Sequence, residues 1–212
     1  MPLDDIAVWG GRELPAKAPS FGGLMVVDVD RWPSRPQLAA WTVRMDRPAL
    51  VAQVGTDGQP EALLMDRQGR VAGHHRGSVA SGRLTVHQIL GRRVGVLLGA
   101  EVWMPEVGRA LGLAGVELVV GFRLPLTGSA YAPLWALAQQ NQWMGVETGV
   151  PPRLVVPCEI TPDESGVLAA VGEGSWWRLT PPWNERRRLV ERDALLAQLN
   201  PAVYLRQPWW ED

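Results

Sequence analysis

The chain has 212 residues, 46% of them hydrophobic, with a formal net charge of −1 and a pI near 6.3. This length and hydrophobic content favour one compact domain with a substantial core. The near-neutral charge argues against a nucleic-acid or anionic-membrane surface, and no run of about 18 apolar residues predicts a transmembrane helix.

Two residue types are scarce enough to limit the chemistry. Cys158 is the only cysteine, which excludes an intrachain disulfide and a cysteine-based metal cluster. Lys17 is the only lysine among 21 basic residues, so a mechanism that needs a lysine in the core is hard to write. The acidic N-terminus is not followed by a signal-like apolar run, and we expect a cytoplasmic protein.

Residues 1–23 contain four glycines and three prolines without a clear period, so we expect an irregular arm there and a single domain over residues 24–212. Within that domain, apolar runs alternate with helical patterns, which is typical of an α/β fold. Strands are expected at 24–28, 49–54, 61–65, 70–75, 84–86, 94–98, 116–120, 144–147, 154–157, 167–171 and 175–179, and helices at 37–45, 105–114, 131–142 and 193–199.

The stretch from Gly95 to Arg109 is the most informative part of the chain. A short apolar run ends in a small-residue turn at Gly99 and Ala100, a helical pattern starts at Pro105, and a second apolar run follows Gly115. Strand, tight turn, helix and strand form a βαβ unit. Its turn lies at the carboxyl end of the first strand, where α/β folds place their chemistry.

This unit resembles the central motif of the carbon–nitrogen hydrolases of the nitrilase superfamily, which runs Gly-x-x-Ile-Cys-Tyr-Asp-x-x-Phe-Pro-Glu-x-x-Arg before a Gly-Ala-Glu strand. The resemblance covers roughly residues 24–200. It implies an α-β-β-α sandwich of two mixed sheets flanked by helices, usually dimerised through one helical layer. We therefore expect a homodimer, with Trp209 and Trp210 at or near the contact. The positions that fit the motif are Gly95, Glu101, Pro105, Glu106, Arg109, Gly115 and Glu117.

The reaction of this family needs a cysteine nucleophile, a glutamate base and a lysine that stabilises the developing charge. The nucleophile position here holds Gly99, and the lysine position falls on Gly77 or, with a slip of one residue, on Arg76. The region of the base holds Asp28-Val-Asp30, in which Asp30 is one methylene shorter than glutamate. These degenerate positions predict that the covalent mechanism is lost.

Three other groups of residues could have a function, but each also has a structural explanation. His74 and His75 are adjacent, so on a strand they would point to opposite faces, and we expect no metal and no other cofactor. Cys158 follows a closing strand and is expected to be a buried structural thiol. Glu106 and Arg109 stand three residues apart on the expected helix, where they can pair and brace the turn before it.

The leading hypothesis is a catalytically inactive carbon–nitrogen hydrolase-like protein that binds a partner or a small carboxylate or amide. Its binding candidates are Arg76, Gly99, Ala100 and Glu101. A divergent hydrolase acting on amide or other C–N bonds through Asp30, Glu101 and Arg76 is the alternative. A second alternative is a structural subunit whose exposed tryptophans bind protein. Convergence of the candidate side chains in one pocket would separate the first two.

Overall fold

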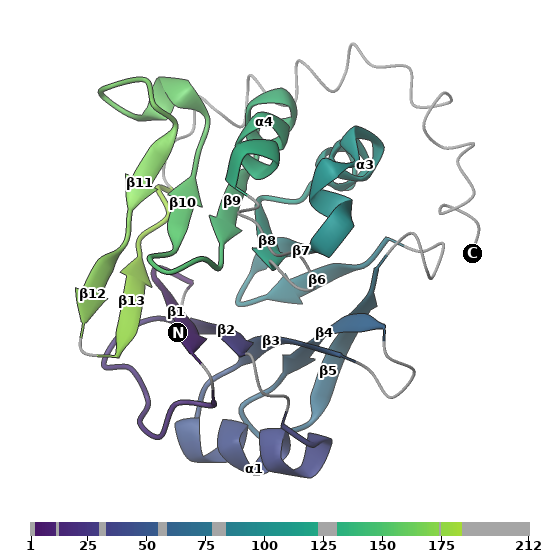
Figure 1. The fold of residues 1–212 in the computed structure, drawn as a ribbon, viewed down its shortest axis with the longest axis vertical. Coiled ribbons are helices and arrows are strands. Elements are labelled where there is room, and N and C mark those ends of the chain that lie inside the picture. Colours follow the sequence, from purple (N-terminus) through teal and green to yellow (C-terminus); the bar gives the residue numbers. More distant parts are fainter. Residues whose placement is uncertain are drawn as a thin grey trace.

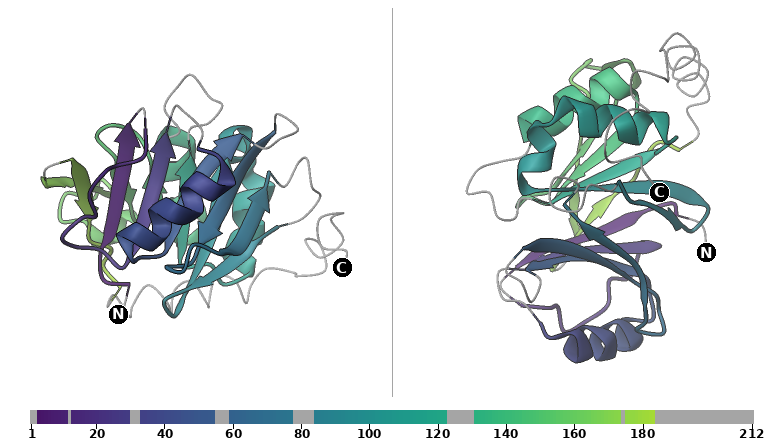
Figure 2. Two further views of the ribbon diagram at one scale, coloured as in Figure 1. Left: turned by 90° about the horizontal axis from the view of Figure 1, so that it is seen from below. Right: turned by 90° about the vertical axis from the view of Figure 1, so that its right-hand side faces the viewer.

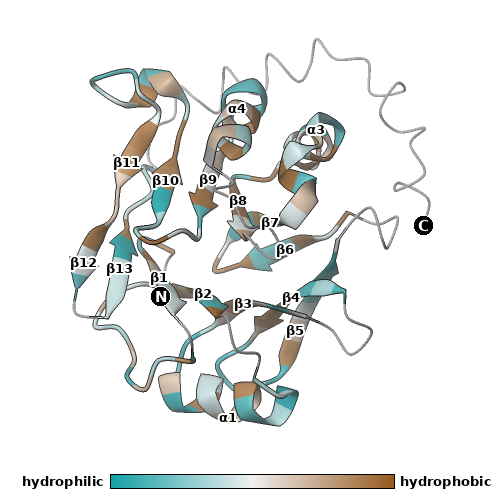
Figure 3. Cartoon of the chain, viewed as in Figure 1, coloured by the Kyte–Doolittle hydropathy of each residue, from teal (hydrophilic) through white to brown (hydrophobic). Residues whose placement is uncertain are grey.

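The computed structural model describes residues 3–11, 13–29, 33–54, 59–77, 84–122, 131–173 and 175–183. Two mixed β-sheets pack face to face, and helices cover their outer faces (Figures 1 and 2). Hydrophobic residues run through the central strands of both sheets, whereas the helices carry both polar and apolar residues (Figure 3). No helix in the described ranges is long and apolar enough to span a membrane.

The first sheet, sheet A, has seven strands, of which the neighbours β1, β2 and β3 are parallel and the others antiparallel. Helix α1 (Arg35–Met45) covers its outer face. Ser34 begins this helix with a capping box, in which its hydroxyl accepts from the Gln37 N–H and the Gln37 side chain accepts from the Ser34 N–H. In spatial order the strands are β12 (Val171–Glu173), β13 (Trp176–Leu179), β1 (Ile6–Gly11), β2 (Leu24–Val29), β3 (Ala49–Val54), β4 (Pro60–Met65) and β5 (Val71–Arg76).

The second sheet, sheet B, has six strands with a parallel centre, β7–β8–β9. Helices α3 (Pro105–Leu113) and α4 (Tyr131–Asn141) cover its outer face. Two short 3₁₀ segments, η1 (Gly99–Trp103) and η2 (Cys158–Ile160), follow β7 and β10. In spatial order the strands are β11 (Val167–Ala169), β10 (Arg153–Val155), β9 (Met144–Glu147), β8 (Leu118–Phe122), β7 (Arg92–Leu98) and β6 (Val86–Ile89).

This architecture confirms the expected sandwich of two mixed sheets with helices outside. Gly99 lies at the turn from β7 into η1, shortly before α3, as the βαβ pattern predicts. The space between the sheets holds the largest apolar core, to which Val26 of β2, Val96 of β7 and Val120 of β8 contribute. Alternate residues of the same strands pack under the helices, because successive side chains of a strand point to opposite faces.

The expected irregular arm over residues 1–23 contains a strand, β1, in the interior of sheet A. Ile6, Ala7 and Val8 are fully buried, and β1 pairs in parallel with β2 and antiparallel with β13. A short strand buried on both faces has no polar–apolar alternation, so the sequence offers no period-two signal for it. Residues 13–23 form neither helix nor strand.

A second difference concerns the strand expected at 167–171. The structure divides this segment into β11, which belongs to sheet B, and β12, which belongs to sheet A. The chain passes from one sheet to the other at Ala170, which packs against the core between the sheets. The helix expected at 193–199 lies outside the described residues.

Three tryptophans hold residues 13–20 against sheet A. From here on, the arm means these residues and not the whole segment 1–23. The arm lacks regular hydrogen bonding of its own, so its buried carbonyl groups need donors from elsewhere. Indole N–H groups supply them to alternate residues, at 2.8 to 2.9 Å: Trp9 to the carbonyl of Glu13, Trp41 to that of Pro15, and Trp176 to that of Lys17.

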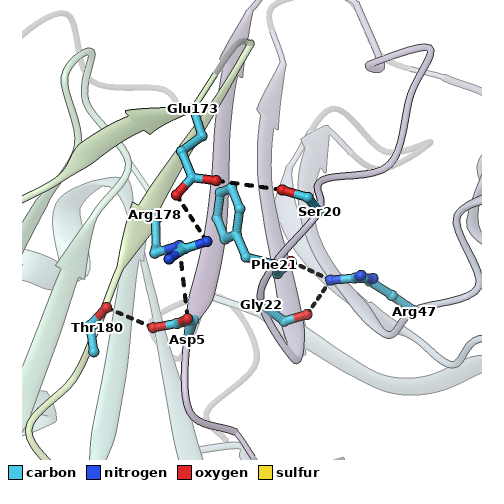
Figure 4. Close-up of polar contacts among 8 residues, drawn as sticks. All are labelled: Asp5, Ser20, Phe21, Gly22, Arg47, Glu173, Arg178 and Thr180. Carbon is cyan, nitrogen blue, oxygen red and sulfur yellow. Dashed lines mark hydrogen bonds and ion pairs between the residues drawn. The ribbon is translucent and has the colours of Figure 1, made fainter.

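Arg178 of β13 fixes the continuation of the arm (Figure 4). Its guanidinium lies 2.9 Å from the Glu173 carboxylate and 4.4 Å from the centre of the Phe21 ring. Glu173 also accepts a hydrogen bond from the Ser20 hydroxyl at 3.4 Å. Arg47 donates to the carbonyls of Phe21 and the residue after it. These contacts order a segment that has no secondary structure.

Candidate functional site

A row of four residues crosses sheet A near the carboxyl ends of β2 and β5. Asp28 is in register with Ala52, Ala52 with Ala62, and Ala62 with His75. Residues directly opposite one another in neighbouring strands point to the same face, and Ala52 and Ala62 belong to the core between the sheets. Asp28 and His75 therefore both face sheet B, separated by two small side chains.

Thr148, directly after β9, meets Asp28 from the opposite sheet. Its hydroxyl donates to the Asp28 carboxylate at 2.5 Å, and its backbone N–H donates to the Gly121 carbonyl of β8 at 3.3 Å. Asp28 is 6% exposed and Thr148 is fully buried. This contact joins the two sheets at one end of the row.

Glu101 and His75 form a buried pair at the other end. Glu101 Oε2 lies 3.0 Å from His75 Nε2 and accepts the backbone N–H of Leu98 at 2.8 Å. His75 is fully buried and Glu101 is 2% exposed. A carboxylate on Nε2 favours the tautomer with its hydrogen there, which leaves Nδ1 as an acceptor. Nδ1 is buried and has no hydrogen-bond partner in the described part of the chain.

His87 of β6 lies near this pair, between the edge strands β5 and β6 of the two sheets. Its ring lies over Gly73, where an added Cβ would stand 2.4 Å from Nδ1, so only glycine fits beneath it. Burial, followed by the charges of His75 and His74, lowers the pKa of His87 to about 4. The imidazole is therefore neutral at pH 7, and its buried Nε2 is also without a hydrogen-bond partner in the described ranges.

The turn after β7 is tight and begins with a glycine. Gly99 is buried with φ of +53°, in the left-handed region where a side chain costs about 1–3 kcal/mol. Ala100 is exposed, and Glu101 turns inward to His75. An added Cβ at Gly77 would stand 3.7 Å from the Glu101 carboxyl, which puts Gly77 beside the pair.

Arg76 lies on the opposite face of β5 from His75. Its Nε is 3.9 Å from Glu61 Oε2, and His74 Nε2 is 2.7 Å from the same oxygen. Glu61 is 2% exposed and also accepts from the Gln53 side chain, on the face of sheet A that α1 covers. The structure thus groups Arg76 with Glu61 and groups Glu101 with His75. Asp30 lies outside the described residues.

The remaining candidates lie apart from this row. Cys158 is half-buried in η2, where burial, then Glu159 and two further acidic residues, raise the thiol pKa. A thiol held in this protonated form is a poor nucleophile. Arg109 donates to the Gln140 carbonyl at 3.3 Å and so links α3 to α4, whereas Glu106 is exposed. No ion pair joins these two residues in the structure, and the described ranges hold no group of three metal-ligating side chains.

Comparison with known proteins identifies the fold that carries this geometry. No protein-family model and no curated protein matches the sequence. The amidase from Nesterenkonia sp. superposes with a TM-score of 0.61 at 16% identity, over 91% of this chain and 97% of that chain. A cysteine-to-alanine variant of the Nesterenkonia AN1 amidase, described as from the nitrilase superfamily, gives 0.58 at 17% identity, over 93% and 97%. The chain has the nitrilase fold.

A further structure of the Nesterenkonia sp. AN1 amidase carries an acetamide moiety on its active-site cysteine. It superposes with a TM-score of 0.61 at 16% identity, over 91% of this chain and 97% of that chain. At identities this low, the similarity shows the fold alone.

Sequence reasoning considered His75 only as a metal ligand, and it missed Thr148. The resemblance places the lysine within residues 73–77, and counting letters favours Gly77 or Arg76. Strand alternation decides only which of these residues face sheet B, and His75 does so because it faces the same way as its register partner Ala62. No local signal marks Thr148, whose partner Asp28 is 120 positions away in the chain.

Proposed function

We propose that this nitrilase-fold protein binds a small amide between its sheets and does not hydrolyse it by the cysteine mechanism. The observation that carries the proposal is Gly99, which supplies no nucleophile at the turn after β7. The only thiol, on Cys158, lies in η2 with a raised pKa, and the only lysine, Lys17, lies on the arm. The three groups of the covalent reaction are therefore not assembled among the described residues.

The polar row supports binding. Buried polar atoms are nearly always hydrogen-bonded, so an orphaned atom such as His75 Nδ1 favours a water or a bound molecule beside it. The alanines between Asp28 and His75 keep side-chain volume in the row low. Asp28 is an acidic acceptor and Nδ1 a neutral one, so the row favours a ligand with N–H donors. Of the two ligand classes that the sequence left open, this favours an amide over a carboxylate.

A second candidate function is hydrolysis by direct attack of water. His75 is oriented by Glu101 through Nε2, which is the arrangement of a base and its orienting carboxylate. Nδ1 would accept the proton of an attacking water. Of the alternative hydrolytic set, Glu101 belongs to this arrangement, whereas Arg76 contacts Glu61 on the other face of β5. Asp30 lies outside the described residues.

The test measures binding and turnover together. Calorimetry with butyramide and butyrate is combined with ammonia release from a panel of amides, nitriles and carbamoyl compounds. We expect butyramide to bind more tightly than butyrate, with binding lost in His75→Phe, retained in Cys158→Ala, and no ammonia released. Ammonia release that survives Cys158→Ala but disappears in His75→Phe and Glu101→Gln would reject binding alone in favour of the second candidate.

We further propose that two copies of the chain associate through the layer of α3 and α4. Trp103 is 62% exposed, which is unusual for a large apolar side chain on a free surface. Light scattering is expected to give twice the 23.3 kDa chain mass, and Trp103→Glu to give the monomer. A monomer in the parent would contradict this. Trp209 and Trp210 lie outside the described residues. The apolar hollow beside Trp103, of about 350 Å³, is lined by Val102, Pro105, Ala132, Pro133, Ala136, Leu137 and Gln140.

A further inference from the structure

We propose that the arm and the neighbouring ends of β12 and β13 form a second binding site, for a small planar aromatic carboxylate. The cavity there, which we call the arm cavity, has a volume of about 510 Å³. Small-molecule sites commonly measure about 300–1,000 Å³. It lies on the face of sheet A away from sheet B, so the proposal does not rest on the amide-binding function. Its lining comprises Trp9, Pro15, Ala16, Lys17, Ala18, Pro19, Ser20, Glu173, Ser175 and Trp176.

Two tryptophans give the arm cavity its apolar walls. The rings of Trp9 and Trp176 have centroids 5.6 Å apart and are tilted by 57°. Both indole N–H groups already donate to arm carbonyls at 2.9 Å, which fixes the rings and occupies their only donors. What remains for a ligand is mainly the accessible part of the Trp9 ring, because Trp9 is half-buried whereas Trp176 is only 4% exposed. Such surface favours a flat, apolar body that stacks or packs edge-on.

The charges at the arm cavity favour an anion. Glu173 is already matched, because Arg178 lies 2.9 Å from its carboxylate and the Ser20 hydroxyl donates to it (Figure 4). Lys17 is exposed on the arm and forms no ion pair with any described residue. The unmatched charge of the lining is therefore the ammonium of Lys17, which would meet a carboxylate at the rim.

Other ligand classes fit the arm cavity less well. An aromatic cation would be repelled by Lys17 and would compete with Arg178 for Glu173, an interaction already in place. A proline-rich peptide would need tryptophan surface that the arm, with Pro15 and Pro19, partly covers. A flat monoanion can bind without breaking the ion pair between Arg178 and Glu173 and without displacing the arm from the tryptophans.

Calorimetry with indole-3-acetate, its methyl ester and tryptamine tests the proposal. We expect the acid to bind about 10-fold more tightly than the ester or the amine, as for a charge-assisted contact at a partly exposed site. Lys17→Met should remove this preference, and Ala18→Trp, which fills the cavity from an exposed position, should abolish binding of all three. Arg67→Met is the control, because it removes an exposed positive charge in the β4–β5 turn, and it should change nothing.

The variants distinguish the two sites. Binding of indole-3-acetate that persists in His75→Phe and falls in Lys17→Met supports the arm cavity. Binding lost in His75→Phe alone would assign the acid to the space between the sheets and overturn the proposal. Equal affinity for acid and ester, or no binding at millimolar ligand, would also overturn it. Circular dichroism should show unchanged unfolding temperatures for Lys17→Met and Ala18→Trp, since both positions are exposed.

Discussion

Neither the parent chain nor a Gly99→Cys variant is expected to release ammonia from simple amides above background. Loss of the nucleophile from a covalent mechanism costs on the order of a millionfold in rate, and the other catalytic groups then contribute little. A cysteine at position 99 would also have to adopt φ of +53°, which is strained for any side chain. Its described neighbour Glu101 is acidic and would raise, not lower, the pKa of a thiol.

The double variant Gly99→Cys with Gly77→Lys is a fairer reconstruction, because position 77 lies beside Glu101. Built in a Cys158→Ala background, it is expected to react faster with iodoacetamide than Gly99→Cys alone, yet to show no turnover. Gly99→Ala is the matched control, since it carries the same backbone strain without a thiol. Ammonia release by the parent that survives Cys158→Ala would contradict the expected inactivity.

Acidification from pH 7 to pH 4 is expected to destabilise the fold by about 3 kcal/mol through His87 alone. Burial, with His75 and His74 nearby, lowers the pKa of His87 from 6.5 to about 4. Between these values the unfolded chain binds the proton and the folded chain does not, so stability falls as pH falls. Each unit of difference corresponds to about 1.4 kcal/mol, and the loss is complete below the folded pKa. Well above pH 6.5, where the imidazole is neutral in both states, the group contributes no pH dependence.

Urea unfolding at pH 7, 5.5 and 4 measures this effect, and His87→Phe isolates it. Phenylalanine is also a flat ring, although a larger one, has no group to titrate and removes the unpartnered Nε2, so the variant should lose about 3 kcal/mol less on acidification. His74→Gln is the control. It removes only the smallest cause of the shift and should keep most of the pH dependence. Parallel pH profiles for the parent and His87→Phe would refute the assignment.

Much of the fold could be predicted from the sequence because its signals are local. The apolar runs of β7 and β8, and the small-residue turn at Gly99 between them, mark a βαβ unit over residues 92–122. The nitrilase-like sandwich inferred from that unit is confirmed. β1 was harder to predict, because its apolar run covers only Ile6–Trp9, and no local pattern could reveal its pairing with β13 from the far end of the described chain. Nor could local patterns divide β11 from β12, which differ only in the sheet they join.

The candidate site was less accessible to sequence reasoning, since its groups meet only through tertiary structure. Glu101 could be named from the motif, but its partner His75 lies 26 positions away, and Thr148 lies 120 positions from Asp28. The sequence by itself determined which residue types stand at the turn after β7, because a glycine at position 99 has no side chain in any conformation. Strand register decided which side chains face one another, because a shift of one residue turns every side chain of a strand to its other face.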